Sequence, residues 1–161
     1  MIKSFFSAVT KKHVERRIVK TNANHLFRII QDVDRYKEFL PLCTESRVLR
    51  RSDCGAFFDA TLTVGLPPLF VESYVSRVQV KPESLIVSTQ SIKSKLFESL
   101  SSQWKLESIS NDDEELTNVD FEVEMTVSDP IIVSIIDRVL QEVAGRQVDA
   151  FEQRCQKLAA G

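Results

Sequence analysis

Apolar and polar residues alternate most regularly in the stretch LTNVDFEVEMTV, residues 116–127. Apolar side chains occupy every second position from Val119 to Val127, and acidic or other polar residues occupy the positions between them. A period of two predicts a β-strand with one buried and one solvated face, as in antiparallel sheets that cover a core on one side. Six further runs bounded by turn residues also predict strands: HVERRIVK (13–20), SRVLRR (46–51), GAFFDATLTV (55–64), LFVESYVSRVQV (69–80), SLIVSTQSI (84–92) and LFESLSSQWKLESI (96–109).

Three other segments have apolar residues at helical spacing. The first is capped by Thr21 or Asn22. Its apolar face consists of Leu26, Phe27, Ile29 and Ile30. The second, DVDRYKEFL, is short and ends at Pro41, because a residue that precedes proline disfavours the helical conformation. The third begins at SDP (128–130), a capping side chain followed by proline, and continues to about residue 158, a length of about 43 Å.

The order of the elements is strand, two short helices, six strands and one long C-terminal helix. This order predicts an α+β fold in which an antiparallel sheet of about seven strands curls around the last helix. That helix carries the largest apolar stripe available to cover the sheet. We expect a flexible N-terminal segment, residues 1–12, and one domain over residues 13–161. A cavity between the sheet and the helix is one form that such a core takes, and a fully packed core is the other.

The composition of the 161-residue chain argues against several classes of protein. A formal net charge of -2 gives no reason to expect nucleic acid as a partner. The two histidines and three cysteines have no metal-ligand spacing, so we predict no metal site, and the odd cysteine count argues against a disulfide framework. No apolar run is long enough to span a bilayer. The basic N-terminus MIKSFFSAVTKK is either the remnant of a mitochondrial presequence or a frayed terminus.

The connection between two of the predicted strands, GLPPLF at residues 65–70, is unusually apolar. Its glycine and two prolines are ordinary turn residues, but its two leucines and its phenylalanine are not. Hairpin connections are normally polar because they lie at the surface and their backbone is solvated. An exposed apolar segment of this kind is typical of a contact with a membrane or with another protein.

Several motifs make the chain resemble the mitochondrial coenzyme Q-binding protein family over residues 13–158. The most specific are DVDRYKEFLP (32–41) and TVGLPPLF (63–70), and LFESLSSQWKL, VDFEVEM and VDAFEQRCQKL add to the pattern. That family belongs to the START-like, polyketide-cyclase-related helix-grip superfamily. Leu42 is a departure, because relatives usually carry an aromatic residue after the FLP motif. We expect this change to affect the fit of the ligand rather than its class.

The resemblance implies a seven-stranded antiparallel sheet around the C-terminal helix, with a lipid-sized hydrophobic cavity between them. It also implies ubiquinone binding on the matrix side of the inner mitochondrial membrane, by a lipid chaperone for quinone biosynthesis and respiration rather than by an enzyme. The implied partners are ubiquinone or a related polyprenyl lipid, the membrane surface, and quinone-biosynthesis or respiratory complexes. No catalytic residue and no catalytic cofactor are implied.

The inward faces of the predicted elements supply the candidate ligand-binding residues. The predicted cavity wall consists of Phe39, Leu62, Val64, Leu66, Phe70, Tyr74, Trp104, Phe121, Val123, Met125, Ile132, Ile135, Ile136, Val139 and Val143. Phe70 and Tyr74 share a face of their strand, from which we expect Glu72 to point away. The polar groups expected to face inward are Tyr74, Ser102 and Trp104, which are suited either to hydrogen-bonding a quinone carbonyl or to packing in the core.

The residues themselves favour a binding protein over an enzyme. No inward acid, base or imidazole forms a proton-transfer pair, and Cys43 has no histidine and acid in a recognisable arrangement beside it. A polyketide cyclase or aromatase is the enzymatic alternative. A ribosome-associated toxin of the same superfamily is the other alternative, and the small negative net charge argues against the basic face that such a protein would need.

We expect the apolar hairpin to form a lip that dips into the membrane interface while the cavity loads. The predicted lip consists of Leu66, Pro67, Pro68, Leu69, Phe70, Lys93 and Lys95. Its two lysines would lie against anionic head groups, where each basic residue contributes about 1 kcal/mol. The alternative is that this segment is a homodimer contact.

Overall fold

The computed structural model describes residues 7–160, which form one antiparallel sheet with helices on one face. Within this part of the chain the strands are β1 (Val9–Val19), β2 (Cys43–Arg51), β3 (Phe57–Leu66), β4 (Phe70–Lys81), β5 (Ile86–Lys93), β6 (Ser99–Ser108) and β7 (Thr117–Val127). The helical segments are α1 (Ala23–Gln31), the 3-10 turn η2 (Val33–Arg35), α2 (Tyr36–Phe39) and α3 (Pro130–Ala160). The predicted α+β order is therefore confirmed.

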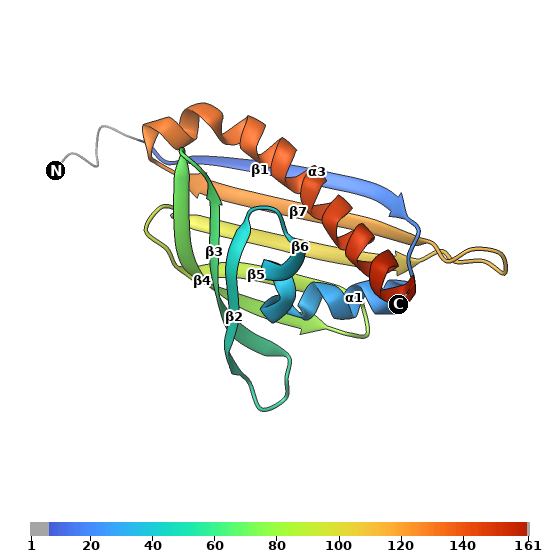
Figure 1. Cartoon of the computed structure of the whole chain (residues 1–161). Helices are drawn as coiled ribbons and strands as arrows, with labels where there is room; N and C mark the ends of the chain where they lie inside the picture. Colours follow the sequence, from blue (N-terminus) through green and yellow to red (C-terminus); the bar gives the residue numbers. More distant parts are fainter. Residues whose placement is uncertain (1–6, 161) are drawn as a thin grey trace.

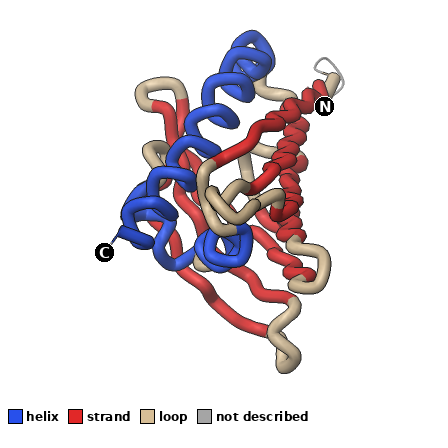
Figure 2. Tube along the Cα trace, turned by 90° about the vertical axis from the view of Figure 1, so that its right-hand side faces the viewer, coloured by secondary structure: helices blue, strands red, loops and turns tan. Residues whose placement is uncertain are grey.

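The seven strands of the described chain are ordered β1-β7-β6-β5-β4-β3-β2. The strands from β2 to β7 pair in the order of the sequence. β1 pairs with β7 and forms one edge of the sheet, and β2 forms the other. β-Bulges between Cys43 and Glu45 and between Val48 and Arg50 interrupt the pairing of β2 with β3, and such bulges bend a strand and increase its twist. The sheet curves around α3, which crosses it diagonally (Figure 1), and the helices lie on one side of the strands (Figure 2).

The first strand begins earlier than the sequence indicated. β1 starts at Val9, which pairs with Val127, and Lys12 pairs with Glu124. The prediction of a flexible segment over residues 1–12 is therefore wrong for residues 9–12, and residues 1–6 lie outside the described residues. The physical reason is the length of β7, whose C-terminal residues need backbone hydrogen-bond partners on the side that faces β1.

The predicted starts of two helices are confirmed in detail. The side chain of Asn22 accepts a hydrogen bond from the amide of His25 at 2.9 Å and so caps α1. The carboxylate of Asp129 accepts hydrogen bonds from the amides of Ile131 at 2.9 Å and Ile132 at 3.3 Å. Both side chains satisfy amides that have no partner inside the helix, which fixes where each helix begins.

Two hydrophobic clusters lie between α3 and the sheet, one toward each end of the helix. In the cluster at the C-terminal half, the ring of Phe151 meets Trp104 edge-on at 5.0 Å and Tyr36 at 5.3 Å between centroids. In the other cluster, Ile132 and Ile136 of α3 pack with residues of β7 and of the β5–β6 connection. The helix therefore joins the two clusters, and the candidate site lies where they meet.

Candidate functional site

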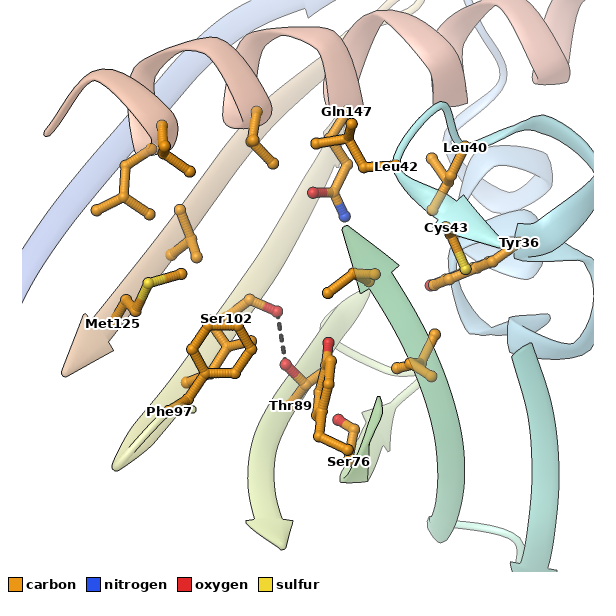
Figure 3. Close-up of a pocket in the computed structure, with 18 of the residues that line it drawn as sticks. Tyr36, Leu40, Leu42, Cys43, Ser76, Thr89, Phe97, Ser102, Met125 and Gln147 are labelled. Atoms are coloured by element: carbon orange, nitrogen blue, oxygen red, sulfur yellow. Dashed lines mark hydrogen bonds between the residues drawn. The ribbon is translucent and has the colours of Figure 1, made fainter. Parts of the chain in front are cut away.

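A cavity of about 170 Å³ lies between the sheet and the middle of α3. Its floor is formed by β3 to β7, its roof by residues 139–147 of α3, and one side by the α2–β2 connection (Figure 3). Every second side chain of each strand faces the cavity, and most of these side chains are apolar, so the wall is largely hydrophobic. A cavity thus exists, and the alternative of a fully packed core is excluded for this part of the fold.

Many of the residues that the sequence placed in the wall do line the cavity. They are Leu62, Val64, Phe70, Tyr74, Trp104, Phe121, Val123, Met125, Val139 and Val143. The period-two pattern identified those on strands, and the helical stripe identified the two on α3. Their role in ligand binding stays a prediction.

The remaining predicted wall residues lie elsewhere. Phe39 lines a separate surface groove, where its ring packs edge-on against Phe151 at 5.1 Å. Leu66 is half-buried at the end of β3 and does not line the cavity. The other three, Ile132, Ile135 and Ile136, belong to the closed cluster at the N-terminal end of α3. The apolar stripe of α3 is longer than the cavity, so its first two turns cover solid core.

Several polar side chains line the cavity, and some of them form no hydrogen bond within the described chain. The hydroxyls of Thr89 and Ser102 bond to each other at 2.6 Å. Tyr74, Ser76 and Gln147 line the cavity, and no hydrogen bond from their side chains to another residue of the described chain is formed. Ser76 is only 3% exposed, so its hydroxyl is shielded from bulk water.

Sequence reasoning missed Ser76, Thr89 and Gln147, although weak signals for them exist. Ser76 stands two residues after Tyr74 on the same strand face. Gln147 stands four residues after Val143, and residues four apart share one face of a helix. Serine, threonine and glutamine are common on solvated faces, so the pattern of apolar residues alone does not select them.

The expectation that Glu72 points away from the core is wrong. Residues 70, 72 and 74 share one strand face because side chains alternate with a period of two, and Glu72 is 8% exposed. Its carboxylate accepts hydrogen bonds from the Ser94 hydroxyl at 2.9 Å, the Lys95 amide at 3.0 Å and the Leu96 amide. Glu72 therefore holds the β5–β6 connection against β4.

The ionisable side chains in the cavity wall are Tyr36, Cys43, Tyr74 and Arg146. Burial raises the pKa of Cys43 to about 11, so its thiol stays protonated near neutral pH. Burial also raises the pKa of both tyrosines. The hydroxyl of Tyr36 donates to the carbonyl of Ile30 and is thus held by the backbone.

A thiol and an imidazole do meet outside the cavity, which the sequence did not reveal. Cys155 Sγ lies 3.5 Å from His25 Nδ1, between α3 and α1. Burial raises the pKa of Cys155 to about 11, and nearby carboxylates act in the same direction. The thiol is 1% exposed, so the pair has the surroundings of a packed core contact and not of a reactive thiolate.

Pro41 and Arg146 mark where the cavity meets the surface. Both are exposed, and both also line the adjacent groove that contains Phe39. Leu42 lies beside them, and its carbonyl accepts a hydrogen bond from the Gly65 amide at 3.0 Å. This opening is called the mouth below.

The predicted lip lies at the surface as two adjacent segments. Leu69 is 47% exposed, Pro67 and Pro68 are exposed, and Phe70 turns inward with its ring 6.4 Å from that of Phe97. The exposed Lys93 and Lys95 belong to the neighbouring segment that Glu72 binds. No helix within residues 7–160 has the length and apolarity of a bilayer span.

The fold and the cavity define the class of protein. The fold is the START-like helix-grip arrangement. The aromatase/cyclase Zhui from Streptomyces sp. R1128 shares it with a TM-score of 0.79, 12% sequence identity, and coverage of 92% of this chain and 95% of that chain. At this identity the likeness concerns the fold alone.

The family follows from the sequence comparison. The family model described as "Polyketide cyclase / dehydrase and lipid transport" matches residues 19–152, and the chain belongs to this family. The superfamily named from the sequence is thereby confirmed. Among curated relatives, "Coenzyme Q-binding protein COQ10, mitochondrial" of Dictyostelium discoideum is 27% identical over 93% of this chain and 70% of its own length. "Ribosome association toxin RatA" of Pseudomonas aeruginosa is 26% identical over 91% and 96%, respectively.

Proposed function

We propose that this protein binds ubiquinone in the cavity between the sheet and α3 and acts as a lipid chaperone. The observation that carries the proposal is a largely apolar cavity wall that includes the neutral hydrogen-bonding groups Tyr74, Ser76 and Gln147. Such a site suits an apolar ligand with a few oxygen atoms. The wall contains no carboxylate or imidazole for proton transfer, which favours binding over cyclase chemistry. The coenzyme Q-binding relative supports the same ligand.

The free energy of hydrophobic transfer limits what the cavity does. A five-carbon tail unit gains roughly 3–4 kcal/mol on leaving water, at about 0.8 kcal/mol per CH₂. The bilayer offers nearly the same gain, so the protein exchanges its ligand with the membrane at little net cost. Specificity then comes from the polar head group, and speed comes from a route that keeps the tail out of water.

This exchange requires contact with a membrane, which we assign to the lip. The proposed setting is the matrix side of the inner mitochondrial membrane, where ubiquinone is delivered to biosynthetic or respiratory complexes. The exposed Leu69 would enter the interface, and Lys93 and Lys95 would meet anionic lipids. A homodimer contact at the same segment is the competing account and is separated from it by the test below.

The first test is the lipid that purifies with the protein. We expect mass spectrometry of the wild-type protein to find a polyprenyl quinone and the variant Val139→Asp to lose it, because Val139 lines the roof and is 8% exposed. A buried unpaired charge also destabilises the fold, so Val139→Phe, which fills the cavity with apolar atoms, is a second variant that should lose the ligand. Leu158→Asp, at a 47% exposed position of the same helix, should keep it.

Other outcomes of this test would contradict the proposal. A folded protein without lipid that cyclises a polyketide would assign the enzymatic alternative. A lipid-free protein that sediments with ribosomes would assign the role named for the RatA relative. Unchanged quinone in both Val139 variants would show that the cavity is not the binding site.

A second prediction concerns the lip. Leu69→Ser should slow quinone transfer to anionic liposomes while changing the free energy of unfolding by only about 0.5 kcal/mol, since Leu69 is 47% exposed. Phe70→Ser should lower the free energy of unfolding by about 3 kcal/mol and should also slow quinone transfer, because the ring packs on Phe97 and lines the cavity. Leu49→Ser is the matched control, at a 45% exposed position on β2.

The measurements for the lip are the transfer rate, the melting temperature and the sedimentation coefficient of each variant. Transfer at the wild-type rate by Leu69→Ser would remove the membrane role. If the same variant changed from dimer to monomer, the segment would be a dimer contact.

A further inference from the structure

A groove with several charged residues lies beside the mouth of the cavity. It is formed by α2 and the C-terminal half of α3, and it shares Pro41 and Arg146 with the cavity. Its other lining residues are Glu38, Phe39, Asp149, Ala150, Gln153, Arg154 and Lys157. Those on α3 lie three or four residues apart from one turn to the next, so they share one face of the helix. The groove therefore continues from the mouth along this face of α3.

Arg154 is the basic residue that the fold holds in place within the groove. Its side chain is 16% exposed, and its Nη2 donates a hydrogen bond to Glu38 Oε1 at 2.9 Å. Its guanidinium carbon lies 5.1 Å from the centroid of the Phe39 ring. Within residues 7–160 the bond to Glu38 is the only side-chain hydrogen bond of Arg154, whereas a guanidinium has five N–H donors. The other donors are therefore available to an anion, at little further cost in side-chain freedom.

Both carboxylates of the groove are already paired with arginines. Glu38 also accepts a hydrogen bond from Arg35 at 2.9 Å, and Asp149 pairs with Arg17 of β1. The remaining two cations of the groove, Arg146 and Lys157, are exposed and form no ion pair within the described chain. The groove thus presents positive charge at both of its ends as well as at the fixed arginine.

We infer that the groove binds the phosphate group of an anionic phospholipid while the mouth lies against a membrane. This site is separate from the quinone cavity, and it rests on the proposed function for its membrane setting. The Arg154 guanidinium donates to phosphate oxygens, whose spacing its planar fork matches, and Arg146 and Lys157 add charge on either side. A bilayer lipid fits the position of the groove, because the groove begins at the opening through which a lipid ligand enters. The bound phosphate holds this opening at the membrane surface.

Flotation with quinone-free vesicles measures this contact apart from quinone exchange. The probes are vesicles of phosphatidylcholine alone and vesicles of an equal mixture with phosphatidylglycerol, and the wild-type protein should prefer the mixture. Lys157→Gln should weaken binding to the mixture roughly fivefold, which corresponds to about 1 kcal/mol for one basic residue at an anionic surface. Arg154→Lys keeps the charge and loses the fork, so it should weaken binding about 3- to 10-fold, whereas a diffuse attraction would leave it unchanged.

Lys105→Gln is the matched control for the loss of one positive charge. Lys105 is exposed and forms no ion pair within residues 7–160. It follows the buried Trp104 on β6, so its side chain lies on the face of the sheet opposite to α3. This variant should bind the mixed vesicles within about twofold of wild type. The melting temperature of each variant shows whether the fold is kept, and Lys157→Gln changes an exposed position that should not affect it.

The quinone content and the vesicle binding separate this inference from the proposed function. If wild type carried quinone and the Arg154 and Lys157 variants bound vesicles like Lys105→Gln, the phosphate site would be wrong and the proposed function would stand. If wild type carried no quinone but its vesicle binding depended on the groove, the proposed function would fail and the phosphate site would stand. Displacement from vesicles by inorganic phosphate would assign the groove to a soluble anion, and loss of ribosomal RNA binding in its place would assign it to nucleic acid. Either of these two results would overturn the inference.

Discussion

A fragment that ends at Ser128 should show no cooperative melting transition. Such a fragment lacks α3, which packs against α1, β1 and β7 and carries eight buried side chains. They are Ile132, Ile136, Val139, Leu140, Ala144, Val148, Phe151 and Cys155. Burying one large apolar side chain stabilises a fold by about 1.5–3 kcal/mol, and a whole domain is stable by only about 5–15 kcal/mol. The loss of the helix is therefore comparable to the entire stability of the domain.

Circular dichroism during heating and limited proteolysis would measure this effect. The control is a fragment of residues 1–157, which removes the exposed Leu158 and keeps the buried Cys155, and which should melt like the full chain. A soluble fragment of residues 1–128 with a sharp transition would show that the sheet is stable without its helical cover.

The sequence predicted the order and type of the elements because their local patterns are strong. The alternation from Val119 to Val127 identifies β7, and the capping side chains of Asn22 and Asp129 fix the starts of α1 and α3. Each of these signals is local, since it depends on neighbours a few residues away. Local signals do not fix where a strand ends, and β1 extends to Val9 because β7 provides a partner there.

The candidate site was predicted less completely, for a physical reason. Which stretch of the α3 stripe meets open space depends on how side chains from distant strands fill the gap. Phe97 and Met125 fill it beneath Ile136, whereas beneath Val139 and Val143 a cavity remains. The polar wall residues were missed because serine, threonine and glutamine give no periodic signal of burial. Only packing places them inside.

Glu72 is the residue whose replacement should have the largest effect among the polar groups of the core. We expect Glu72→Ala to lower the free energy of unfolding by about 3 kcal/mol, since hydrogen bonds to a charged group contribute about 1.5–3 kcal/mol each and water replaces part of them. For a domain of this length, such a loss lowers the melting temperature by about 6–12 °C. Glu72→Gln keeps an acceptor oxygen for the Lys95 and Leu96 amides, so it should cost about half as much.

Glu72→Ala should also speed ligand exchange, because the connection that Glu72 holds contains Phe97, a residue of the cavity wall. Freed from the carboxylate, this connection should open more often, and bound quinone should leave Glu72→Ala faster than it leaves wild type. Glu98→Ala is the control, because Glu98 is an exposed glutamate at the end of the same connection, and the expected change in the free energy of unfolding is within about 0.5 kcal/mol. Thermal unfolding and stopped-flow release into liposomes measure the two effects. A Glu72→Ala protein with wild-type stability would show that the buried carboxylate does not hold the wall. Lower stability with unchanged release would show that the wall at Phe97 does not limit the release of quinone.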